Sequence, residues 1–308
     1  MASPSDLPVA PPPEGPSVAA LLRAARQRLV GATGPGEAGE SPHLDAEVLL
    51  RHVLGVSRAA LLTHPQRRLT PDEVGRYQAL VERRASAEPV AYLTGEREFM
   101  GLTFAVDRRT LIPRPETETL VERALPLLSG RPALVVDVGT GSGAIAVSVV
   151  ALAAAPAALR VVGIDRSWEA LQVGRANAAR LVPAGRARPL FLQSCLLRGV
   201  RGRFDLVLAN LPYVAAADLA VLPAPVARYE PRLALDGGGD GLDLYRALLA
   251  DLPGRVAPGG AVLLECDPRQ AGQLGALLRA ALPEATVQVH RDLAGRERVV
   301  EGVLPGGV

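Results

Sequence analysis

The sequence contains no lysine, so its 34 basic residues are all arginines. Together with frequent Ala, Gly and Pro, this skew indicates a coding bias more simply than a function. The 32 acidic residues leave a net charge of +2, and this near balance provides no overall field that favours nucleic acid. Aromatic residues are scarce at 3%, but 308 residues with 48% apolar content suffice for a sizeable core and two domains.

Cysteines, histidine ligand pairs and long apolar runs are scarce as well. Cys195 and Cys266 lie far apart without Cys-x-x-Cys spacing, which argues against a disulfide scaffold and a thiolate metal site. We interpret Cys195 as a buried structural thiol, because it has no histidine nearby in the sequence. No apolar run has membrane-spanning length, and the N-terminus lacks a basic-then-apolar signal. We therefore expect a cytoplasmic protein with no membrane association and no bound metal.

The character of the chain changes several times along its length. Its first residues are rich in proline and lack periodic hydrophobicity, which predicts disorder. Apolar residues at helical spacing follow, and Thr70-Pro71 is a typical start for a helix that continues through Arg84. Short β-like pieces around Gly101 then predict a hairpin. We expect a disordered tail (1–16), a helical domain (17–87), a hairpin linker (88–113) and a second domain (114–308).

Strand-like and helix-like segments alternate after Pro115. This alternation predicts an α/β domain with a parallel, doubly wound sheet. Near the C-terminus, Thr286–His290 and Arg298–Val303 are joined by a short loop, which predicts an antiparallel hairpin at the sheet edge. The other expected strands are Leu134–Val138, Arg160–Ile164, Pro189–Gln193, Asp205–Ala209 and Ala261–Glu265.

A glycine-rich turn, Gly139-Thr140-Gly141-Ser142-Gly143, follows the first of these strands. Glycines allow a ligand to approach backbone N–H groups at the start of a helix, although a coincidental turn also satisfies the pattern. Asp165 closes the next strand, at a spacing where a carboxylate accepts hydrogen bonds from ribose hydroxyls. An N-cap for the following helix is the alternative role. We favour the ribose role, and with it a nucleoside cofactor.

The tetrapeptide Asn210-Leu211-Pro212-Tyr213 ends a later strand and is the more specific signal. An amide or amine nitrogen with a delocalised lone pair is a poor nucleophile. Two oxygens, from the Asn210 side chain and the Leu211 backbone, can orient it and stabilise the positive charge that develops as a methyl group arrives. Pro212 keeps Leu211 extended and Tyr213 offers an aromatic face, whereas an ordinary Asx–Pro turn is the alternative. Together with the glycine turn, the tetrapeptide predicts methyl transfer from S-adenosylmethionine to nitrogen.

Two further features have more than one interpretation. The segment from Glu230 to Gly241 is rich in glycine, but its acidic residues favour a flexible lid beside the active site over a phosphate cradle. Arginines on the N-terminal helices can contact an acidic or RNA-bearing partner, or they can form a solvated helix face.

From about Leu44 to Val300 the chain resembles the peptide chain release factor glutamine N5-methyltransferases, the PrmC/HemK family. The stretches that carry the resemblance best are Glu88–Phe99 (EPVAYLTGEREF) and Leu111–Glu118 (LIPRPETE). Glu230-Pro231 and Asp292–Val299 fit later segments of the family. The resemblance implies a helical domain that grips a release factor, followed by a seven-stranded, Rossmann-like domain that methylates the glutamine of the Gly-Gly-Gln loop.

The resemblance also implies the roles of individual residues. S-adenosylmethionine contacts fall on Gly139–Gly143, Asp165, Asn210 and, beside the adenine, Cys195, whereas the catalytic, substrate-holding residues are Asn210–Tyr213. The expected partner is a release factor, with no stable nucleic-acid binding, and the expected state is a monomer. Three positions depart from the family pattern: Leu211 replaces a proline, Cys195 an aspartate and Met100 an aromatic residue. Because a thiol is a weak acceptor, Cys195 predicts reduced cofactor affinity.

Two alternatives follow from these departures. Asn-Leu-Pro-Tyr also resembles the rRNA adenine dimethyltransferases, so adenine N6-methylation of RNA or DNA is the second hypothesis. In those enzymes the catalytic domain precedes the helical one, which is the reverse of the order expected here. A non-catalytic adaptor on a degenerate methyltransferase fold is the third hypothesis, and the intact Asp165, Asn210 and Tyr213 argue against it.

Overall fold

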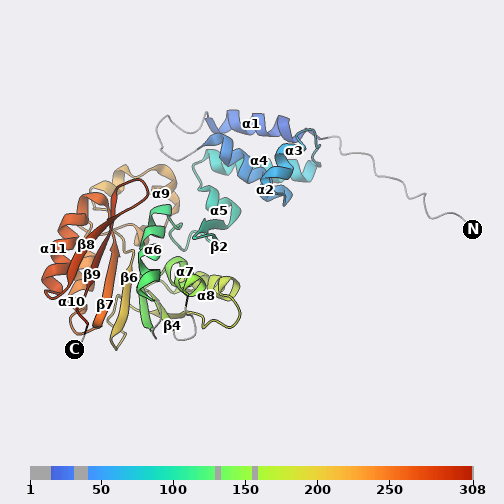
Figure 1. The fold of residues 1–308 in the computed structure, drawn as a ribbon. Coiled ribbons are helices and arrows are strands. Elements are labelled where there is room, and N and C mark those ends of the chain that lie inside the picture. Colours follow the sequence, from blue (N-terminus) through green and yellow to red (C-terminus); the bar gives the residue numbers. More distant parts are fainter. Residues whose placement is uncertain (1–14, 31–40, 129–132, 155–158, 307–308) are drawn as a thin grey trace, which may run out of the picture. The chain divides into compact units, whose positions relative to one another are not determined.

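The computed structural model describes residues 15–30, 41–128, 133–154 and 159–306 (Figure 1). They form two compact units: the residues up to Thr94 together with Pro223–Pro225, and Gly95–Leu222 together with the residues from Val226 onward. Apart from Gly15 and Pro16, the tail expected at 1–16 lies outside the described residues. None of the helices in the described ranges is both long and apolar enough to cross a membrane.

The first unit is a small bundle of helices with one apolar core. Thr70 opens α4 with a capping box, in which its side chain and that of Glu73 each accept a backbone N–H of the other residue. Tyr77 is almost completely buried, and its hydroxyl donates to the Ala46 carbonyl at 3.1 Å. The helices are α1 (Val18–Val30), α2 (Pro42–Leu54), α3 (Arg58–Thr63), α4 (Pro71–Ala85) and α5 (Val90–Thr94).

The expected hairpin is present at the start of the second unit. Strands β1 (Glu96–Phe99) and β2 (Leu102–Ala105) pair antiparallel around the two-residue turn Met100-Gly101. Both turn residues have positive φ, 53° and 71°, which matches the twist of a tight hairpin. The Glu118 carboxylate accepts the Met100 N–H at 2.6 Å, and this bond holds the turn against the rest of the unit.

The second unit contains a seven-stranded sheet in the order β5-β4-β3-β6-β7-β9-β8. The five strands β3 to β7 run parallel, whereas β9 is antiparallel to both of its neighbours. This architecture confirms the predicted doubly wound sheet with an antiparallel hairpin at one edge. The strands are β3 (Ala133–Val138), β4 (Leu159–Asp165), β5 (Leu190–Gln193), β6 (Phe204–Ala209), β7 (Val256–Glu265), β8 (Thr286–Arg291) and β9 (Glu297–Val303).

Helices cover both faces of this sheet (Figure 1). On one face α6 (Glu118–Leu127), α7 (Ala144–Leu152) and α8 (Trp168–Leu181) pack side by side, and on the other α10 (Asp243–Asp251) packs beside α11 (Ala271–Ala281). The central strands β3 and β6 are almost entirely buried apolar runs, as expected for a parallel sheet that is covered twice. Asn177 on α8 binds the hairpin through two hydrogen bonds. Its side-chain oxygen accepts the Ala105 N–H, and its side-chain nitrogen donates to the Ala105 carbonyl.

Candidate active site

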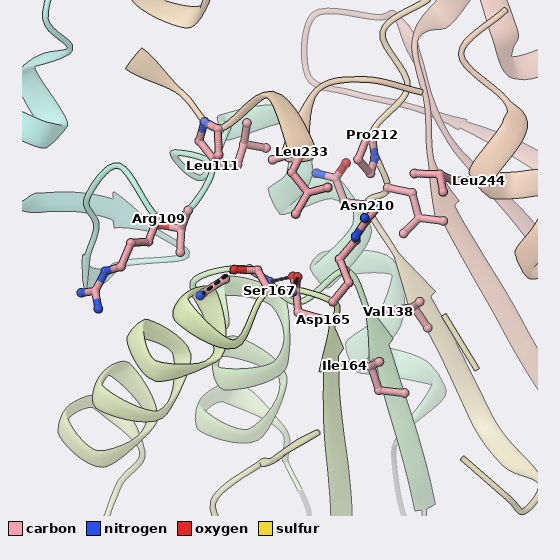
Figure 2. Close-up of a pocket in the computed structure, with 18 of the residues that line it drawn as sticks. Arg109, Leu111, Val138, Ile164, Asp165, Ser167, Asn210, Pro212, Leu233 and Leu244 are labelled. Carbon is pink, nitrogen blue, oxygen red and sulfur yellow. Dashed lines mark hydrogen bonds between the residues drawn. The ribbon is translucent and has the colours of Figure 1, made fainter. Parts of the chain in front are cut away.

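The sheet order creates a crevice at the carboxyl ends of its central strands. The chain runs outward from β3 to β4 and β5, then returns to the other side of β3 as β6. Open α/β sheets bind ligands at such a reversal of strand order. A cavity of about 620 Å³ lies there, and the residues that follow β3, β4, β5 and β6 all contribute to its wall. Figure 2 shows Asp165 and Asn210 facing this cavity, with Leu111 and Leu233 across from Asp165.

Two of the five residues in the glycine turn line the cavity directly, namely Gly139 and Gly141. Gly139 has φ 79°, and a Cβ added there would lie 3.0 Å from Leu211 Cδ2 and 3.4 Å from the Asn210 carbonyl oxygen. A side chain at this position would therefore both strain the backbone and crowd the tetrapeptide.

The other three residues of the turn hold it in place. The Thr140 hydroxyl donates to Asp137 at 2.7 Å, and the Ser142 carbonyl accepts the Asn177 side-chain amide at 2.9 Å. Gly143 has φ 78°, and a Cβ there would lie 3.2 Å from the Gly174 Cα of α8. These three positions shape the turn and its packing, whereas Gly139 and Gly141 form the surface of the cavity.

Asp137 at the end of β3 was not predicted as a site residue. It is fully buried, and one of its oxygens accepts the Thr140 hydroxyl and the Ala146 N–H at the start of α7. Burial raises the pKa of this carboxyl to about 7, although both hydrogen bonds act against the shift. An acidic residue near the end of an otherwise apolar strand, separated from the turn by Val138 alone, is the sequence signal that could have indicated it.

Asp165 closes β4 beside the glycine turn, as expected. One carboxylate oxygen accepts the Gly141 N–H and the other accepts the Ser167 N–H, both at 2.9 Å. The N-cap of α8 is Ser167, whose hydroxyl accepts the Ala170 N–H at 3.1 Å, so the alternative role of Asp165 as an N-cap is wrong. Asp165 instead ties the turn to the neighbouring strand. Burial raises its pKa above the usual value, and the backbone N–H groups oppose that rise.

Cys195 lies in the loop after the edge strand β5. The interpretation of this residue as a buried structural thiol is wrong, because its side chain is exposed and lines the cavity beside Ser194 and Leu196. An edge strand leaves the following loop open on one side, and the local sequence does not reveal this exposure.

The tetrapeptide after β6 divides its residues between the cavity and the core. Asn210, Leu211 and Pro212 line the cavity, whereas Tyr213 does not and packs against the core. The Asn210 side-chain nitrogen donates to the Thr117 hydroxyl at 3.1 Å. The Leu211 N–H donates to the Tyr245 hydroxyl, also at 3.1 Å. Sequence reasoning identified neither Thr117 nor Tyr245.

The segment after Glu230 lies beside the cavity, with Pro231 to Ala234 and Asp236 in its wall. Backbone hydrogen bonds tie this segment to the residues that follow the tetrapeptide: Leu235 and Gly237 both bond Val214, and Gly238 bonds Ala216. Glu230 is buried and accepts from Arg114 at 2.5 Å. The segment is therefore a wall of the cavity that is tied to the residues after the tetrapeptide, and its role as a flexible lid stays a prediction.

Comparison with known proteins agrees with this architecture. A model of the PrmC N-terminal domain matches residues 20–95, and a model of the methyltransferase small domain matches residues 117–237. A release factor glutamine methyltransferase from Deinococcus radiodurans is 43% identical over 93% of this chain and 98% of its own length. The solved release factor-specific protein-(glutamine-N5) methyltransferase from Alicyclobacillus acidocaldarius is 30% identical, with a TM-score of 0.40, over 66% of this chain and 99% of that one. The hMettl16 catalytic domain, solved with a 3'UTR hairpin, shares the fold alone at 15% identity and a TM-score of 0.54, over 74% of this chain and 83% of that one.

The fold and the matched domain models define a methyltransferase. The extent and identity of the match to the Deinococcus radiodurans protein are more specific. The chain belongs to the family of the release factor glutamine methyltransferases.

Proposed function

We propose that this protein transfers a methyl group from S-adenosylmethionine to the side-chain amide nitrogen of the glutamine in the Gly-Gly-Gln motif of peptide chain release factors. The observation that carries the proposal is that Asn210 and the glycine turn line one cavity, in a chain that belongs to this family. The cavity volume of about 620 Å³ lies within the range that holds a nucleoside-sized ligand.

The residues of the cavity fit S-adenosylmethionine. Gly139 and Gly141 expose their backbone to the cavity because they have no side chain. A Cβ at Gly139 would fill the space beside Leu211. Each Asp165 oxygen accepts one backbone N–H and has a further lone pair for a ribose hydroxyl. Cys195 lies beside the same space. When bound, the cofactor supplies a methyl group on a sulfonium centre, whose leaving group is a neutral thioether.

The tetrapeptide would hold the acceptor amide. Because the Asn210 side-chain nitrogen donates to Thr117, its oxygen is left to accept an N–H from the substrate glutamine. The Leu211 carbonyl supplies the second acceptor, and Pro212 restricts the backbone of Leu211 to an extended form. Two such acceptors orient the amide and stabilise the positive charge that develops on its nitrogen.

The test is label transfer from S-adenosylmethionine that carries tritium in its methyl group. The purified protein is incubated with a release factor, with the same factor in which the Gly-Gly-Gln glutamine is alanine, and with ribosomal RNA. We expect label on the intact factor only. The Asn210→Ala variant should lose at least about a hundredfold in kcat while its cofactor affinity changes much less, since one of two oriented charge-stabilising groups is removed.

Each of the other outcomes contradicts the proposal in a different way. Label on RNA would identify an adenine methyltransferase, and label on neither substrate would favour a non-catalytic adaptor. Label on the factor that lacks the glutamine would show that the enzyme modifies a protein at a different residue.

A further inference from the structure

The carboxylate of Glu265 is buried at the end of β7 without a role in the site described so far. Its side chain is completely inaccessible to solvent. Neither of its oxygens has a partner with ordinary hydrogen-bond geometry in the described part of the chain. Burial raises the pKa of this carboxyl to about 7. A buried carboxylate is costly unless hydrogen bonds compensate it, so the groups around it matter.

Two hydroxyl groups lie close enough to favour the ionised form of Glu265, those of Thr117 and Tyr213. Among the charged groups that face it, Glu116 before α6 disfavours ionisation and Arg298 on β9 favours it. On the main-chain side of the same residue, the Tyr245 hydroxyl donates to the Glu265 carbonyl and accepts the Leu211 N–H. The Glu265 backbone is thus linked to Leu211 through the Tyr245 hydroxyl, and its carboxyl lies near the Thr117 hydroxyl that accepts from Asn210. Leu264 pairs with Ala209 across β7 and β6, which brings the residues that follow them, Glu265 and Asn210, to the same end of the sheet.

The direction of the hydrogen bonds follows from the single proton of the Thr117 hydroxyl. The Thr117 oxygen already accepts from the Asn210 side-chain nitrogen at 3.1 Å. Its own proton therefore needs an acceptor. The nearby Glu265 carboxylate is such a group, because it has no proton to donate when it is ionised. With its proton directed to Glu265, the Thr117 oxygen is free to accept from the Asn210 nitrogen, so the Asn210 oxygen is left for another donor.

We propose that Thr117 and Glu265 are positioning residues, which aim the side-chain oxygen of Asn210 at the substrate amide. This inference rests on the proposed function, because the amide in question is that of the release factor glutamine. Neither Thr117 nor Glu265 lines the cavity, so their effect reaches the reaction through Asn210.

The test compares Thr117→Val, which removes the hydroxyl at constant shape, with Thr117→Ser, which keeps it. Thr119→Val is the matched control, because Thr119 is buried on the adjoining helix α6 and its side chain makes no hydrogen bond within the described ranges. We expect Thr117→Val to lower kcat about tenfold or more, with KM for the release factor and the Kd for cofactor changed less than twofold. Thr117→Ser and Thr119→Val should stay within about threefold of the wild-type kcat. Glu265→Gln replaces a carboxylate that only accepts by an amide that can also donate to Thr117, so it should lower kcat, but by less than Thr117→Val does.

A second readout does not require turnover. The side-chain amide resonances of Asn210 can be identified by their loss in Asn210→Ala. They should shift in Thr117→Val and keep their positions in Thr117→Ser and Thr119→Val. The inference is refuted if these resonances do not move in Thr117→Val, or if Thr119→Val lowers kcat as much as Thr117→Val. A wild-type rate for Glu265→Gln would refute the part assigned to Glu265. A wild-type protein that labels no release factor would contradict the proposed function, and the amide resonances would still decide the positioning role.

Discussion

Replacing Gly139 by alanine should separate backbone strain from crowding at the proposed cofactor cavity. Gly139 has φ 79°, and an added Cβ would lie 3.0 Å from Leu211 Cδ2. Leu211 is only 3% exposed, so it has little room to withdraw. Gly185 offers a matched control, since its φ is 83° and an added Cβ would meet nothing within 4 Å. Each alanine should lower the free energy of unfolding by about 1–2 kcal/mol, the cost of a left-handed conformation.

Of the two variants, only Gly139→Ala should also weaken the binding of the cofactor. The displaced Leu211 and Asn210 form the wall of the cavity, and a loss of about 1.4 kcal/mol there corresponds to about tenfold in Kd. Urea denaturation measures the stability of both variants, and calorimetric titration with S-adenosylmethionine measures the affinity. Equal Kd values for the two variants would show that the cavity wall tolerates the added methyl group. The assignment of Gly139 to the cofactor surface would then be wrong.

Two further predictions concern ionisable positions. Cys195→Asp should raise cofactor affinity severalfold in the same calorimetric titration. A carboxylate at this exposed position in the cavity accepts stronger hydrogen bonds than a thiol does. An unchanged Kd would contradict the idea that Cys195 limits affinity. Glu265 has a pKa of about 7 in the folded protein against an ordinary value of 4.5, so the stability it contributes is complete below pH 4.5 and is lost as the pH rises through 7. The unfolding free energy of the wild type should fall between pH 4.5 and 8, and Glu265→Gln should lessen that fall by about 3 kcal/mol. Asp137, whose pKa is also about 7, contributes equally in both proteins and cancels in the comparison. Identical slopes in urea denaturation across this range would show that Glu265 titrates normally.

The parallel strands could be predicted from the sequence because most of them are buried apolar runs. β3 and β6 are nearly continuous apolar segments, and the structure places both within a residue of the prediction. β7 begins at Val256, five residues earlier than expected, because Pro258 and two glycines interrupt its apolar pattern. Helices α3 and α5 span only six and five residues, too few for a helical repeat to become visible.

The candidate site could be predicted only where its residues are close in the sequence to a strand end. The glycine turn, Asp165 and the tetrapeptide each follow a recognisable strand, and the parallel sheet brings them to one edge. Glu265 lies at the same end of the sheet as Asn210 because β7 pairs with β6, and Thr117 reaches Asn210 from the segment before α6. That proximity depends on the order of strands in the sheet, which the periodicity of any one strand does not determine.

Leu211 shows how a local departure can be compensated from a distance. A proline at this position would fix φ through its ring and would have no N–H to donate. Leucine has that N–H, and here it donates to the hydroxyl of Tyr245, 34 residues away, which itself donates to the Glu265 carbonyl. A chain of hydrogen bonds thereby restrains the backbone that presents the Leu211 carbonyl. The fully buried hydroxyl of Tyr245 satisfies two backbone groups that would otherwise be unpaired in the core. The direction of the proposed second acceptor, the Leu211 carbonyl, therefore depends on β7 and α10, which take over the restraint that a proline ring would provide.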